Sequence, residues 1–136
     1  MNNKSATAPV ISLTRLLENA RAEITEKTPQ EVHQLMGQDD VLLIDIRDIR
    51  ELTREGVIPG SYHCPRGMLE FWIAPDSPYH KPALSPDKHL ILHCASGWRS
   101  ALAAKSLQDM GCPRVSHLAG GFTAWKESGN KVEEKT

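Results

Sequence analysis

The chain has 136 residues, which suits one domain with a single hydrophobic core. Its hydrophobic content of 40% and charged content of 24% are ordinary for a globular chain, and a net charge of −1 predicts no general attraction to nucleic acid or to a membrane surface. No apolar run approaches the roughly 20 residues of a membrane span, and the N-terminus lacks a signal-peptide apolar region. Three cysteines without a Cys-x-x-Cys spacing argue against a disulfide framework or a zinc site. We therefore expect a reducing, cytoplasmic compartment and no bound metal.

The first segment, residues 1–24, is expected to lie ahead of the main domain. The first ten residues are mostly polar and include Pro9, so we expect them to be disordered. Apolar residues at helical spacing then begin at Leu13 and predict an amphipathic helix from about Ser12.

The main domain is expected over residues 25–132, followed by a polar tail at 133–136. Within it, short apolar runs alternate with helical patterns. The predicted strands are 23–27, 41–46, 61–64, 90–93 and 115–118. The predicted helices are 28–36, 49–53, 67–73, 100–110 and 122–127. This alternation predicts an α/β fold, with a parallel sheet of about five strands flanked by helices on both faces. Ligands bind such folds at the carboxyl ends of the strands.

The most informative stretch runs from Cys94 to Ser100. It connects the apolar strand at 90–93 to the helix predicted at 100–110. Free backbone N–H groups and the positive end of the helix dipole meet at such a helix start, and together they favour a thiolate over a thiol. A free cysteine is often only a small buried apolar residue. The nearby Arg99 charge and the bend permitted by Gly97 favour a nucleophilic role for Cys94 instead.

Four motifs in order resemble those of single-domain rhodaneses, which are sulfurtransferases. They are the Cys94–Ser100 loop, the strand Leu43–Arg47, the segment Gly56–Ser61 with Val57 where a histidine is usual, and Gly120–Trp125. The resemblance covers about residues 25–132. It implies that the Cys94 thiolate takes sulfur from a donor such as thiosulfate, forms a persulfide, and passes the sulfur to a thiol or cyanide. It implies no cofactor.

Loop length bears on the reaction. Cys94 to Arg99 spans six residues, whereas related phosphatases and arsenate reductases carry one more residue and so cradle a tetrahedral anion. Two-domain rhodaneses that use thiosulfate tend to have basic residues where Ala95 and Ser96 stand here.

A sulfur-relay or protein-interaction module, exchanging sulfur with a donor or acceptor protein, is the second candidate function. A phosphatase or arsenate reductase is the third.

Several side chains are expected to contribute to the site. Asp45 is expected either to orient the loop or Arg99 or to cap a turn. Arg47 is expected to be a surface charge, with a pair to a carboxylate or a place at the mouth of the site as alternatives. His93 is expected to be structural because neighbouring strand residues point to opposite faces, and Cys64 is a weaker candidate for a second reactive sulfur. The expected substrate-binding residues are Ala95, Ser96, Gly97, Trp98, Arg99, Ser100 and Arg66.

Overall fold

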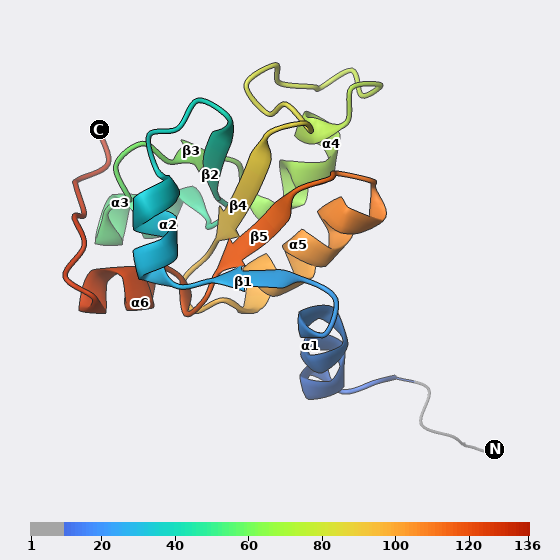
Figure 1. The fold of residues 1–136 in the computed structure, drawn as a ribbon, viewed down its shortest axis with the longest axis horizontal. Helices are drawn as coiled ribbons and strands as arrows, with labels where there is room; N and C mark the ends of the chain where they lie inside the picture. Colours follow the sequence, from blue (N-terminus) through green and yellow to red (C-terminus); the bar gives the residue numbers. More distant parts are fainter. Residues whose placement is uncertain (1–9) are drawn as a thin grey trace.

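A computed structural model describes residues 10–136. Its helices are α1 (Leu13–Arg21), α2 (Pro29–Leu35), α3 (Ile49–Glu55), α4 (Leu69–Ile73), α5 (Trp98–Asp109) and α6 (Gly121–Glu127), with one 3-10 turn, η1 (Arg66–Met68). Its strands are β1 (Thr25–Lys27), β2 (Val41–Asp45), β3 (Tyr62–His63), β4 (His89–His93) and β5 (Val115–Leu118). These strands form one sheet in the order β1-β5-β4-β2-β3, and every neighbouring pair is parallel. The predicted fold class is confirmed (Figure 1).

The core has two halves because successive strand residues point to opposite faces of the sheet. Leu43 and Ile91 pack with residues of α2 and α6, including Val32 and Trp125. Their strand neighbours Ile44, Leu90 and Leu92 pack on the other face with residues of α4 and α5, such as Leu69 and Leu107. The two central strands are therefore buried on both sides, as the apolar runs predict.

Local signals in the sequence set several helix starts. Thr28 and Asp48 each cap a helix through a reciprocal capping box, with Glu31 and Glu51 as the third residues. Helix α3 extends to Glu55, beyond the single turn expected at 49–53. Helix α5 begins at Trp98, two residues earlier than expected, because Gly97 adopts a left-handed conformation and ends the loop there.

Helix α1 confirms the predicted amphipathic segment. Ser12 caps it by accepting a hydrogen bond from the Arg15 N–H, and its buried residues Leu17 and Ala20 lie on the side that packs against α5. Leu13 and Leu16 remain exposed. The predicted disorder of the first ten residues falls almost entirely outside the described residues. In the described part of the chain, no helix is both long enough and apolar enough to cross a membrane.

Candidate active site

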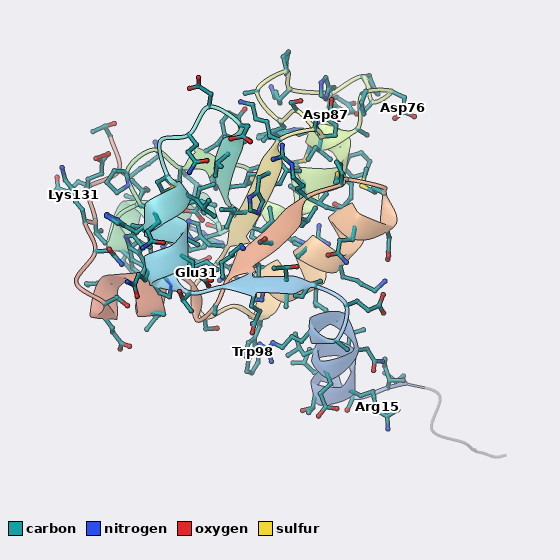
Figure 2. All side chains as sticks on the ribbon, in the orientation of Figure 1. Arg15, Glu31, Asp76, Asp87, Trp98 and Lys131 are labelled. Atoms are coloured by element: carbon teal, nitrogen blue, oxygen red, sulfur yellow. The ribbon has the colours of Figure 1, made fainter. Side chains whose placement is uncertain are left out.

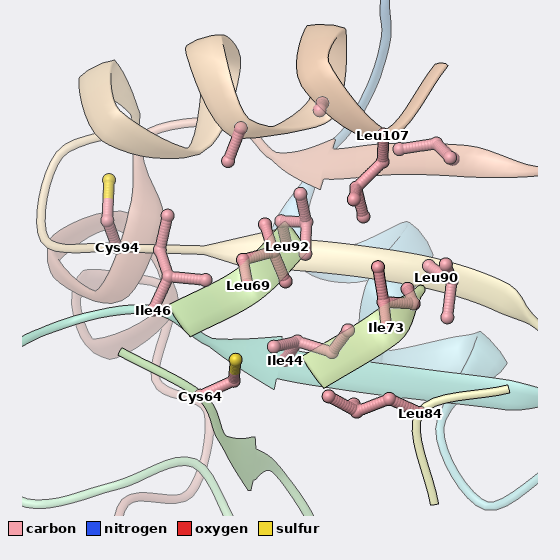
Figure 3. Close-up of a cluster of buried hydrophobic side chains, with 13 residues drawn as sticks. Ile44, Ile46, Cys64, Leu69, Ile73, Leu84, Leu90, Leu92, Cys94 and Leu107 are labelled. Carbon is pink, nitrogen blue, oxygen red and sulfur yellow. The ribbon is translucent and has the colours of Figure 1, made fainter. Parts of the chain in front are cut away.

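Cys94 lies immediately after β4, at the carboxyl edge of the sheet. The backbone enters α5 four residues later, and the sulfur is turned toward the start of that helix (Figure 3). Cys94 is 1% exposed and belongs to the apolar cluster that includes Ile46 and Leu69. The nucleophile proposed from the sequence therefore sits at the bottom of a closed loop.

Hydrogen-bond donors converge on the Cys94 sulfur. The Gly97 backbone N–H donates to it at 3.2 Å, and the Ser100 backbone N–H donates at 3.4 Å. The Ser100 hydroxyl oxygen lies 3.6 Å from the same sulfur. Backbone donors fixed in this way stabilise negative charge on sulfur, whether as a thiolate or as a bound anion.

The N-terminus of α6 holds the loop in this orientation. The Phe122 N–H donates to the Cys94 carbonyl at 2.8 Å, and the Thr123 N–H donates to the Ala95 carbonyl at 3.1 Å. These two bonds direct the Cys94 and Ala95 carbonyls to the first turn of α6. Gly121 allows this close approach, because a Cβ there would lie 2.7 Å from the carbonyl oxygens of Cys94 and Ala95. The Gly-Gly pair at 120–121 is thus part of the site's construction.

Both arginines expected near the mouth are ion-paired with carboxylates. The Arg99 guanidinium donates to both carboxylate oxygens of Glu51, at 2.8 and 3.0 Å, and so ties the loop to α3. Arg66 donates to both oxygens of Glu70, at 2.8 and 3.0 Å, and Glu70 also accepts from Ser106 on α5. The pair with Arg99 lowers the pKa of Glu51, although burial raises it in part.

Asp45 and Arg47 form a buried pair, so the favoured expectation of a surface charge at Arg47 is wrong and the alternative, a pair with a carboxylate, is confirmed. Arg47 is fully buried, with its Nε 3.0 Å and its Nη2 2.8 Å from the Asp45 carboxylate oxygens, and it lies over the Phe122 ring. Asp45 also accepts the Arg47 backbone N–H at 3.0 Å, which is the turn-capping alternative. Burial raises the pKa of Asp45, but the hydrogen bonds from Arg47 together with the neighbouring His93 and Arg47 charges outweigh burial, and the pKa is lowered. Asp45 bonds to Arg47 rather than to Arg99.

The other two cysteines differ from Cys94 in their surroundings. Cys64 is fully buried at the end of β3, and burial raises the pKa of its thiol to about 12. Burial likewise raises the pKa of Cys112, which is free and partly exposed. His93 is buried, and burial lowers the pKa of its imidazole. Its Nδ1 lies 3.3 Å from the Cys94 carbonyl oxygen, so the ring contacts the backbone of Cys94 and not its sulfur.

The outer wall of the loop is exposed. Ser96 and Trp98 are exposed, whereas Ala95 and Arg99 are partly buried. The Trp98 side chain is 54% exposed and projects away from the sheet (Figure 2). Phe71 on α4 is also exposed, while Trp72 is partly buried and packs against the core cluster.

Three residues of the site's surroundings escaped the sequence analysis: Glu51, Glu26 and His117. Glu51 binds Arg99, as described above. The Ser100 hydroxyl lies 2.9 Å from Nδ1 of His117 on β5, and Nε2 of that ring lies 2.9 Å from a carboxylate oxygen of Glu26 on β1. Between residues 10 and 136, no group of three or more metal-ligating His, Cys, Asp or Glu side chains is found.

Comparison with known proteins identifies the family of this arrangement. The family model described as a rhodanese-like domain matches residues 28–128. A sulfurtransferase of Allochromatium vinosum is 32% identical over 96 residues, which span 71% of this chain and 81% of that protein. A thiosulfate sulfurtransferase of Glaesserella parasuis is 30% identical over 109 residues, spanning 80% of this chain and 93% of that protein.

Two solved structures share the fold over nearly the whole chain. A Rhodopseudomonas palustris protein of unknown function, described as a possible tyrosine phosphatase, is 46% identical with a TM-score of 0.87, covering 95% of this chain and 99% of its own. A homodimeric polysulfide-sulfur transferase of Wolinella succinogenes is 27% identical with a TM-score of 0.70, covering 90% of this chain and 88% of its own.

Proposed function

Because the chain belongs to the rhodanese-like domain family, we propose that it is a sulfurtransferase that works through a persulfide on Cys94. One observation carries the proposal: the Cys94 sulfur accepts hydrogen bonds from the Gly97 and Ser100 backbone N–H groups inside a six-residue loop. These donors would stabilise the anionic end of a persulfide as oxyanion-hole donors stabilise developing charge. The sulfurtransferase relatives support the same reaction class.

The reaction consists of two displacements at sulfur. In the first, the Cys94 thiolate attacks the outer sulfur of a donor such as thiosulfate, a new S–S bond forms, and sulfite departs with the electron pair of the broken S–S bond. In the second, cyanide or a thiol attacks the terminal sulfur of the persulfide, and Cys94 leaves as a thiolate. Neither step calls for a cofactor.

The arrangement of charge favours sulfur chemistry over phosphate chemistry. A phosphatase of this loop type uses its arginine as a two-point clamp on phosphate oxygens. In this chain the two terminal guanidinium nitrogens of Arg99 bind Glu51, so a phosphate would compete with this ion pair for the arginine. Cys94 is also only 1% exposed. A single added sulfur atom therefore fits beside it more easily than a tetrahedral phosphate group.

A protein sulfur donor or acceptor is the second candidate for the partner in this reaction. Trp98 favours it, because a large aromatic side chain that is 54% exposed beside the nucleophile offers apolar area to a docking surface. A putative sulfur carrier protein of Bacillus subtilis, 28% identical over 109 residues, is among the relatives. The physiological acceptor would then be a protein thiol rather than a small molecule.

Paired kinetics test the proposal. Wild type should form thiocyanate from thiosulfate and cyanide, Cys94→Ala should form none, and Cys112→Ser should match wild type. Hydrolysis of an aryl phosphate should be negligible in all three proteins. Faster hydrolysis of the phosphate than transfer of sulfur would replace this proposal with the phosphatase. Transfer only from a protein persulfide, with no turnover of thiosulfate, would favour the relay module.

A further inference from the structure

A continuous row of polar side chains leads from the Cys94 sulfur to the protein surface. The Ser100 hydroxyl oxygen lies 3.6 Å from the sulfur and 2.9 Å from Nδ1 of His117. Nε2 of the same ring lies 2.9 Å from a carboxylate oxygen of Glu26. The four residues come from the end of β4, from α5, from β5 and from β1. The sheet order places β1 next to β5 and β5 next to β4, which brings them into line.

Burial changes sharply along this row. Cys94, Ser100 and His117 are 1%, 0% and 0% exposed, whereas the Glu26 side chain is 47% exposed. The imidazole also lies directly beneath the loop, since a Cβ on Gly97 would be 3.8 Å from Cε1 of His117. A proton leaving the closed loop therefore has a hydrogen-bonded route to a group in contact with water.

The chemistry of each group fixes the direction of its hydrogen bond. The Glu26 carboxylate only accepts, so Nε2 of His117 carries the hydrogen in that bond. In the neutral ring Nδ1 is then a bare acceptor, and it takes the hydrogen of the Ser100 hydroxyl. The Ser100 oxygen is left to accept from the Cys94 thiol. Every hydrogen bond in the row is thus donated in one direction, from the sulfur through the imidazole to Glu26.

We propose that Ser100, His117 and Glu26 form a proton relay that converts the Cys94 thiol to the thiolate. The thiol gives its proton to the Ser100 oxygen, while the Ser100 hydroxyl gives its own proton to Nδ1 of His117. The electron pair stays on sulfur, and the imidazolium forms an ion pair with the Glu26 carboxylate. The Ser100 hydroxyl now donates to the thiolate. Ser100 touches the reacting atom, and His117 and Glu26 are positioning residues; the relay rests on the proposed function of Cys94 as a nucleophile.

The charged groups around the ring fit this role. Burial lowers the pKa of His117 and Arg21 of α1 lowers it further, so the resting ring is neutral and Nδ1 is free to accept a hydrogen bond. The hydrogen bond that Nε2 donates to Glu26 raises the pKa in part, and so it favours the imidazolium that the relay forms. Arg99, in the loop, and the Gly97 and Ser100 N–H groups then favour the thiolate that is left behind. Burying the His117 imidazole in β5 costs desolvation free energy that an apolar side chain would avoid. The hydrogen bonds to Ser100 and Glu26 offset that cost.

Strands β4 and β5 also supply a control pair. His89 on β4 lies 3.0 Å from the hydroxyl of Ser116 on β5, which is again a histidine–serine pair, but no cysteine adjoins it. A substitution at His89 therefore tests the general cost of removing a strand histidine without touching the relay.

The test is the rate at which iodoacetamide alkylates Cys94, followed from pH 5 to pH 10 by mass spectrometry of the Cys94 peptide. Only the thiolate reacts, so the profile reports its fraction. At pH 6.5 we expect His117→Gln and Ser100→Ala each to slow alkylation about tenfold. The double variant should be no slower than either single variant, because both remove one path. Glu26→Gln should slow alkylation about threefold, and His89→Gln should match wild type.

Three results would overturn the relay: a His117→Gln profile that superimposes on wild type, effects that multiply in the double variant, or an equal loss in His89→Gln. If His117→Gln does not fold, Glu26→Gln decides, because its half-exposed side chain is replaced by one of the same shape. Alkylation needs no sulfur donor. A shifted profile in a protein that transfers no sulfur would therefore refute the proposed function and leave the relay standing.

Discussion

Arg99 and Glu51 are 48 residues apart in the chain, yet the two guanidinium–carboxylate distances between them are 2.8 and 3.0 Å. The same Glu51 carboxylate accepts the Asp48 backbone N–H at 3.1 Å, as the third residue of the capping box of α3. One side chain therefore both caps the start of α3 and holds the Cys94–Ser100 loop against that helix. This pairing also occupies both terminal nitrogens of the loop arginine.

Replacing Glu51 by Gln should release Arg99. We expect the free energy of unfolding in urea to fall by about 1 kcal/mol, because the pair is partly exposed. Inhibition of sulfur transfer by inorganic phosphate should become several-fold stronger, since the guanidinium fork is then free to bind an anion. Arg50→Gln, which removes an exposed arginine paired with Asp48, is the control. Unchanged inhibition by phosphate would show that Glu51 does not restrain Arg99.

Gly121→Ala should destabilise the Cys94–Ser100 loop by pushing α6 against it. A Cβ would lie 2.7 Å from backbone atoms of Cys94 and Ala95, at a residue whose φ is +62°. Overpacking and left-handed strain together predict a loss of roughly 2–4 kcal/mol in the free energy of unfolding. Gly111→Ala is the matched control, because its φ is +94° but nothing lies within 4 Å of the added Cβ. Equal losses in the two variants would mean that the contact with the loop is unimportant.

Stability should decline as the pH falls. Burial lowers the pKa of His93 from 6.5 in the folded protein, so the unfolded chain binds more protons once the pH drops below 6.5. The contribution of neutral His93 to the free energy of unfolding is complete above pH 6.5. It is lost as the pH falls through the lower pKa that His93 has in the folded protein. The Arg47 bonds lower the pKa of Asp45 from 3.8, which adds a second loss below about pH 4.

Urea unfolding at pH 8, 6, 5 and 4 measures this decline. In His93→Asn the difference between pH 8 and pH 5 should shrink, without vanishing, because burial lowers the pKa of His117 too. A wild type that gains stability between pH 8 and pH 5 would contradict the burial of a neutral His93.

Cys64 should take no part in the chemistry. Its thiol is fully buried and its pKa is raised to about 12, so almost no thiolate exists at neutral pH. Cys64→Ala should keep the rate of sulfur transfer within about twofold while costing roughly 1 kcal/mol of stability for the lost packing. Sulfur found on the Cys64 peptide of Cys94→Ala, after treatment with thiosulfate, would contradict this.

Features fixed by neighbouring residues were predictable from the sequence. The strand before Cys94, the capping box at Thr28 and the Gly-Gly pair at the start of α6 are all local patterns, and the structure contains each of them. The surface position expected for Arg47 was wrong. A charged side chain usually contacts water, but the carboxylate of Asp45, two residues away, pairs with the guanidinium inside the core.

Features that depend on distant contacts were not predictable. The partners Ser100 and His117 are 17 residues apart, and His117 and Glu26 are 91 apart, so only the strand order brings them together. One signal was present: Ser116 and His117 are polar residues inside the four-residue strand β5, every residue of which is buried. A buried polar pair in a short strand asks for partners, but it does not say which ones.

The mass of the protein tests most directly whether Cys94 carries the transferred sulfur. After incubation with thiosulfate and removal of the excess, wild type should gain the mass of one sulfur atom, located on the Cys94 peptide and lost again on adding cyanide. Cys94→Ala should gain nothing under the same treatment. An unmodified wild type, or a sulfur atom located on Cys64 or Cys112, would contradict the claim.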